Sequence, residues 1–251
     1  MKGTVLASLG VVLALGAAAH AQKCVPPDDM KPKLAGTPSV EVINDLGVWF
    51  AQHEQFDCAV QVFATSLQTD PQQRDLRHVV FELGAALLYS GDTGAAITAF
   101  QQAEGLGYRD VNLHRLLAGA LDAQQATADA IEEWKRALEF DPDSAPELEE
   151  LSSDLLVAGR YQDAVDLLQQ PRVRPYRSIS QFLNLASALI QLGRAEEAAT
   201  ALEEGMNTYP SSKEIAQKLG AILIGLNRNA EAAMVLRLAE QQSVTPRGTS
   251  N

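Results

Sequence analysis

The sequence predicts an all-α protein, a right-handed α-solenoid of about six stacked helix-turn-helix units. The main observation is a repeat that begins at Leu46 and recurs to the end of the chain, first after 37 residues and then every 34. A repeat of this length indicates stacked pairs of helices rather than one closed core. The leucines that open the six copies are Leu46, Leu83, Leu117, Leu151, Leu185 and Leu219.

Other fixed positions of the repeat describe two helices that pack closely. A small residue follows each leucine, a bulky apolar residue comes four positions after it, and an alanine comes thirteen positions after it. Residues four apart share a helix face, so the leucine and the bulky residue form one apolar stripe. The alanine and a large apolar residue four positions later form the facing stripe of a second helix. The alanines are Ala59, Ala96, Ala130, Ala164, Ala198 and Ala232.

The repeat also sets the order of segments along the chain. Residues 22–39 form a proline-rich tail, six units follow, and residues 247–251 form a short C-terminal tail. The units cover residues 40–73, 77–110, 111–144, 145–178, 179–212 and 213–246. Glycines eight positions after the leucine, such as Gly91, are suited to end the first helix of a unit. Pro171 stands inside the expected second helix of unit four, so we expect that helix to end near Gln169 and a loop to follow.

Residues 1–21 have the features of a secretory signal peptide. Lys2 precedes an apolar run from Val5 to Ala19, and Ala19-His20-Ala21 has the form of a cleavage site. The apolar run is shorter than the roughly 20 residues that a membrane span needs. We therefore expect export to the periplasm or the outside of a bacterial cell, with no membrane segment left after cleavage.

Charge and motifs limit the function classes. The chain has 20 basic and 32 acidic residues, a net charge of −12, and cleavage at Ala21 removes Lys2 and changes this to −13. Such an acidic chain argues against nucleic acid as a partner. His53, His78 and His114 lie in different units without metal-ligand spacing, and no catalytic or cofactor motif occurs. We expect no enzyme, no metal and no cofactor.

The two cysteines leave two alternatives open. Cys24 lies in the proline-rich tail and Cys58 lies in the second helix of unit one. An even number of cysteines in an exported protein is consistent with a disulfide, but two free thiols fit the sequence equally well.

The repeat resembles the tetratricopeptide repeat family at the leucine, small-residue and alanine positions above. The family pattern runs Trp, Leu-Gly, Tyr, Ala, Phe, Ala and Pro over 34 residues, and the resemblance covers residues 40–246. The Trp position is the main departure, since Ile43 and His114 are among its occupants. The resemblance implies a non-enzymatic scaffold that binds a protein or peptide segment. The alternative is a self-associating assembly factor, a homo-oligomer through the ends of the array.

The resemblance also implies where the partner binds. The concave face of such arrays is lined by first-helix residues near the conserved leucine, and here its candidates are Asn44, Phe81, Tyr89, Arg115, Glu149, Leu183, Gln191 and Gln217. Phe81, Tyr89 and Leu183 are the expected apolar anchors. A second candidate is the basic cluster of Arg172, Arg174, Tyr176 and Arg177, because arginine and tyrosine are common at interfaces. The alternative is that these arginines pair with nearby acidic side chains.

Overall fold

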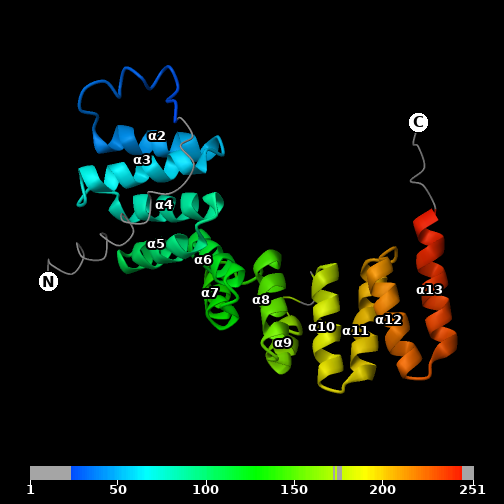
Figure 1. The fold of residues 1–251 in the computed structure, drawn as a ribbon. Helices are drawn as coiled ribbons and strands as arrows, with labels where there is room; N and C mark the ends of the chain where they lie inside the picture. The colour runs from blue at the N-terminus through cyan, green and yellow to red at the C-terminus, as the bar shows by residue number, and fades with distance from the viewer. Residues whose placement is uncertain (1–23, 172, 174–176, 245–251) are drawn as a thin grey trace. The chain divides into compact units, whose positions relative to one another are not determined.

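The computed structural model describes residues 24–171, 173 and 177–244, and this part of the chain contains twelve helices and no strand. The all-α prediction is therefore confirmed. Figure 1 labels the helices, whose bounds are α2 (Val40–Gln52), α3 (Phe56–Thr69), α4 (Leu76–Ser90), α5 (Thr93–Gly105), α6 (Val111–Ala123), α7 (Thr127–Phe140), α8 (Ala145–Val157), α9 (Tyr161–Leu168), α10 (Ile179–Gln191), α11 (Ala195–Thr208), α12 (Lys213–Gly225) and α13 (Asn229–Val244). The predicted signal peptide, Arg172, Arg174, Tyr176 and the tail 247–251 lie outside the described residues.

The chain forms two compact units, Met1–Glu133 and Trp134–Asn251, which divide within α7. The first unit holds α2 to α6 and the start of α7, and the second holds the remainder of α7 and α8 to α13. In each unit the helices follow one another in antiparallel pairs (Figure 1). No described helix is long and apolar enough to cross a bilayer.

Small residues bring the two helices of a pair together. The repeated alanines are all at most 2% exposed. A Cβ atom on Gly47 would lie 2.6 Å from Cε1 of Phe63, and one on Gly84 would lie 2.8 Å from two ring atoms of Phe100. These distances are well below ordinary carbon contacts of about 3.5–4.0 Å. In the first two units, the glycine after the opening leucine therefore creates the space that the second helix fills with a phenylalanine ring.

The turn inside each pair has a left-handed residue at one fixed position, eight after the opening leucine. Gly91, Gly159 and Gly193 have φ angles of 95°, 70° and 74°. The other three turns reach the same conformation with Glu54, Gln125 and Asn227, whose φ angles are 58°, 60° and 60°. The predicted glycine caps are thus present, and three further turns adopt the same geometry without glycine.

The second helix of unit four is short, as Pro171 predicts. α9 covers only Tyr161–Leu168, with Gln169 as its C-cap. The segment that follows is not wholly a surface loop, because Val173 and Arg177 are both buried. The buried side chains of Val173 and Arg177 in the connection thus compensate for the shortness of α9.

The cysteine alternatives resolve in favour of a disulfide. Cys24 and Cys58 are bonded, with their Cα atoms 5.5 Å apart. The N-terminal segment is therefore attached to α3 before it leads into α2.

Candidate functional site

The candidate contacts of the first unit are not equally accessible. Phe81 is only 7% exposed, and its ring stacks on Tyr108 with a centroid distance of 4.5 Å. The expectation of an accessible apolar anchor at Phe81 is therefore wrong, since an aromatic residue from the α5–α6 turn covers it. Asn44 is half-buried, and its Nδ2 donates a hydrogen bond to Oε1 of Gln73 at 2.7 Å.

Tyr89 and Arg115 of the first unit lie on the surface. Tyr89 is exposed, and its ring stacks on Phe56 with centroids 5.1 Å apart. The Arg115 guanidinium is exposed and lies 3.5 Å from Oδ1 of Asn112. Tyr89 is thus a surface aromatic held rigidly by its neighbour, a property suited to a partner contact.

In the second unit, two of the predicted residues lie in one cavity. Leu183 of α10 and Gln217 of α12 line a cavity of about 430 Å³ together with Glu214, Lys218 and Ala221. Leu183 and Gln217 occupy the same position in their repeats, two residues before the opening leucine. The repeat geometry therefore brings equivalent residues of neighbouring units to the same face.

A second cavity continues along α12. It has a volume of about 380 Å³ and is lined by Ile190, Ala195, Lys218, Ala221, Ile222, Gly225 and Leu226. Lys218 and Ala221 line both cavities, so the two form one groove between α10 and α12. We call these two cavities the C-terminal groove.

One exposed aliphatic side chain of the groove occupies a repeated position. Ile190 lines the groove and lies five positions after its opening leucine, and the equivalent residue of α12, Ile224, is 55% exposed outside the groove lining. The equivalent residue of α8 is also aliphatic. It is Leu156, and the exposed Val157 follows it. The sequence analysis missed Ile190 and Lys218. The recurrence of an aliphatic residue five positions after the leucine was the signal that could have found the first.

Charged groups are sparse in the groove. Lys218 is the cation among its lining residues and Glu214 is the anion. The other two predicted residues of this unit lie elsewhere on α8 and α10, where Glu149 accepts a hydrogen bond from the Ser178 hydroxyl at 2.9 Å and Gln191 is exposed. The groove is therefore suited to apolar contact, with one ammonium and one amide to orient a ligand.

Arg177, of the predicted basic cluster, is a buried structural residue. Its Nε donates a hydrogen bond to the Leu168 carbonyl at 2.9 Å, and its guanidinium lies 3.3 Å from a Glu204 oxygen. The guanidinium also lies 5.3 Å from the centre of the Phe182 ring. For Arg177 the structure supports the alternative of pairing with an acidic side chain, because so buried a group is not available to a partner.

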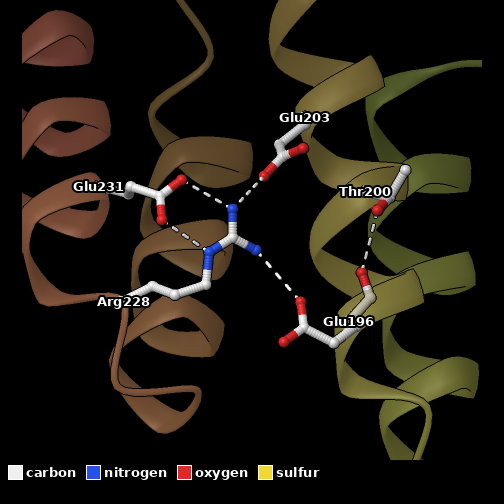
Figure 2. Close-up of polar contacts among 5 residues, drawn as sticks. All are labelled: Glu196, Thr200, Glu203, Arg228 and Glu231. Carbon is white, nitrogen blue, oxygen red and sulfur yellow. Dashed lines mark hydrogen bonds and ion pairs between the residues drawn. The ribbon is translucent and has the colours of Figure 1, made fainter.

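A second arginine ties helices together elsewhere in this unit. Figure 2 shows Arg228, which precedes α13, bonded to Glu231 at 2.7 Å and to Glu196 and Glu203 of α11 at 3.2 Å each. The hydrogen bond to Glu231 raises the pKa of Arg228, and the same bond lowers the pKa of Glu231. Because each of the three carboxylates in this cluster places an oxygen on the arginine, we assign the cluster to helix packing rather than to ligand binding.

The described residues hold no candidate metal centre. No group of three or more histidine, cysteine or acidic side chains is placed to hold a metal ion in the described part of the chain. Nδ1 of His114 lies 2.8 Å from Oε2 of Glu133, but both side chains are buried between helices. This pair therefore has no access to a substrate from solvent.

Comparison with known proteins agrees with the helix pairs. Residues 81–145 and 182–211 match sequence profiles of the tetratricopeptide repeat. A search of curated protein sequences finds no match.

Several solved structures share the fold. A tetratricopeptide repeat protein from Parabacteroides merdae is 14% identical with a TM-score of 0.62, covering 78% of this chain and 77% of its own. YrrB, described as a protein of this family with an unusual peptide-binding site, is 13% identical with a TM-score of 0.64, covering 76% of this chain and 97% of its own. A double mutant of MamA RS-1 is 16% identical with a TM-score of 0.56, covering 67% and 97%.

Proposed function

Because the chain belongs to the tetratricopeptide repeat family, we propose that it is a non-enzymatic scaffold that holds a protein or peptide segment in the C-terminal groove. The observation that carries this proposal is the groove itself, where Leu183, Ile190 and Ala221 give an open apolar surface. The peptide-binding site described for YrrB, a protein of the same fold, supports it.

The size of the groove fits a short segment. Its lining runs along α12 from Glu214 to Leu226, which spans about 18 Å at 1.5 Å per residue. An extended peptide of about five or six residues covers this length. We expect apolar side chains of the partner to bury against Ile190 and Ala221, while Lys218 and Gln217 bond its polar atoms and set its direction.

A substitution that fills the groove tests the proposal. Peptides that bind the wild-type chain would be selected from a displayed random library, and their affinity measured by fluorescence anisotropy. Ala221→Trp should weaken binding at least tenfold, because the indole occupies the space where the two cavities join. Ala128→Trp, at an exposed alanine of α7, is the matched control and should bind like the wild type. Equal affinity of the Ala221→Trp variant would contradict the proposal.

We place this scaffold in the bacterial cell envelope, as an exported periplasmic or extracellular protein. The support is the leader pattern of residues 1–21 and the Cys24–Cys58 bond, which is typical of an oxidising compartment. Fractionation of cells that express the full chain tests the location. Recovery of the oxidised protein in the cytoplasm with Met1 retained would contradict it.

A second candidate function is self-association through α13. Two and six positions after the repeated alanine, the first five units have polar residues, but the last unit has Met234 and Leu238. These side chains are 59% and 43% exposed. Two apolar residues four apart form a ridge that a second helix can cover. Sedimentation of the wild type against a Met234→Thr, Leu238→Glu variant decides whether a dimer forms through this ridge.

A further inference from the structure

The first helix pair carries a covalently closed strap, which we define as residues 24–38. The strap begins at Cys24, which is bonded to Cys58 of α3, and it ends just before α2 starts at Val40. The bond joins residues 34 apart, so the closed loop contains the strap, all of α2 and the turn into α3. Figure 1 shows the strap arching past α2 on the side away from α4.

The most deeply buried residue of the strap is apolar. Met30 is only 7% exposed, whereas Asp28, Asp29 and Lys31 around it are exposed. A turn fixes its position, because the N–H groups of Met30 and Lys31 both donate to the Pro27 carbonyl, at 3.1 and 3.2 Å. Met30 is therefore the buried apolar contact that anchors the strap, and the charged residues beside it face water.

The strap lies beside the first helix pair that the structure describes. In other units the residue four positions before the opening leucine is fully buried, as at Val79, Gln181 and Ile215, but Val42 in unit one is only half-buried. Three positions after the leucine, a fully buried alanine recurs at Ala86, Ala120 and Ala188, whereas unit one has the half-buried Trp49. Val42 and Trp49 thus mark the face of α2 that no other described helix covers. The first and last units of such stacks need a covering element of this kind.

The two sulfur atoms of the bond differ in access. Cys58 is 0% exposed within α3, whereas Cys24 in the strap is half-buried. Thiol–disulfide exchange requires a thiolate to reach one sulfur of the bond. Only attack at Cys24 leaves the helix packing around Cys58 undisturbed.

We propose that the Cys24–Cys58 disulfide is a redox-operated latch: a dithiol reductant opens it, frees the strap and uncovers the outer face of α2. One thiolate of the reductant attacks Sγ of Cys24, and Cys58 leaves as a thiolate that takes up a proton. The second thiolate of the reductant then attacks the mixed disulfide, and Cys24 leaves as a thiolate and is protonated. Two electrons and two protons pass to the protein, and the reductant becomes a disulfide.

Hydrogen exchange of the full mature chain tests the latch. In a dithiothreitol redox buffer, reduction should speed amide exchange of the strap at least tenfold while α3 to α6 keep the exchange rates of the oxidised protein. In a Trp134→Phe background, the emission of Trp49 should shift to longer wavelength on reduction, because the freed strap leaves the face of α2 on which this half-buried ring lies. The Cys24→Ser variant should reproduce both effects without a reductant.

Two results would overturn the proposal. If amide exchange in the strap is as slow in the reduced chain as in the oxidised chain, packing alone holds the strap in place and the bond is not a latch. If α3 to α6 lose protection together with the strap, the bond is a general structural staple and not a latch. A Met30→Ser variant with the bond intact distinguishes the effect of Met30 packing from the effect of the disulfide. This variant should expose Trp49 while Cys58 stays resistant to alkylation.

Discussion

Replacing Gly47 by alanine should destabilise the first unit, although alanine is the better helix former. A Cβ atom at this position would lie 2.6 Å from Cε1 of Phe63, about 1 Å closer than an ordinary carbon contact. Phe63 is only 1% exposed, and the protein interior around such a ring is packed as densely as an organic crystal. Overpacking of this kind costs about 1–3 kcal/mol, and we expect the upper part of that range here. Alanine in place of glycine returns about 1 kcal/mol of helix propensity. The net loss should therefore be about 1–2 kcal/mol.

Gly119 supplies a matched control on another helix of the same unit. It lies inside α6, it is exposed, and no atom lies within 4 Å of the Cβ that would be added. Gly119→Ala should therefore stabilise the chain by about 0.5–1 kcal/mol. The two variants, which make the same chemical change, should differ by about 2 kcal/mol in opposite directions from the wild type.

Urea denaturation followed by circular dichroism would measure this difference. The dependence of unfolding free energy on urea should be the same for both variants, so that the midpoints report stability alone. A Gly47→Ala protein as stable as Gly119→Ala would refute the argument that the small residue exists to admit Phe63. Combining Gly47→Ala with Phe63→Leu should recover part of the loss, because the shorter side chain leaves room for the methyl group.

Other positions give equally direct expectations. Gln125→Gly should raise the melting temperature by about 2–4 °C, because the left-handed backbone conformation of a non-glycine residue costs about 1 kcal/mol. Gly91→Ala should lower the melting temperature for the same reason. Burial raises the pKa of Tyr108 to about 12, so the contribution of Tyr108 to the free energy of unfolding is fully present below pH 10 and is lost as the pH rises towards 12. A Tyr108→Phe chain should lack this loss in alkaline melting curves. Arg177→Met should lower the unfolding free energy by about 2–3 kcal/mol in urea, because it leaves a helix-end carbonyl and a carboxylate without their donor. Intact mass of exported protein should show cleavage after Ala21, and retention of Met1 would contradict the leader assignment.

Helix positions could be read from the sequence because the repeat fixes which residues face each other. The leucine and alanine positions are buried as expected, and α9 ends where Pro171 requires. The three left-handed turns without glycine were not predicted. Glu54 and Gln125 carry no sequence signal for that conformation, and the cooperative packing of the two flanking helices imposes it.

Side-chain accessibility was harder to predict than position. The family pattern assigned Phe81 to a binding face, but it does not specify the connecting turn that places Tyr108 over that ring. Likewise, the charge of Arg177 suggested a surface patch, although the side chain is buried and bonded to the Leu168 carbonyl. In both misreadings one of the two interacting residues, Tyr108 or Arg177 itself, lies on an irregular connection, and a repeat pattern describes only the helices.

The residues that stabilise the second unit lie apart from those that line its groove, and this separation bears on function. Arg177 and Arg228 hold α9, α11 and α13 through carbonyl and carboxylate contacts, and neither arginine lines the C-terminal groove. Between α10 and α12, by contrast, exposed aliphatic groups such as Ile190 remain uncovered, and each costs free energy while it faces water. An array that needed only stability would have polar residues there, as it does on most other exposed positions. The aliphatic lining therefore supports the proposal that a partner covers it.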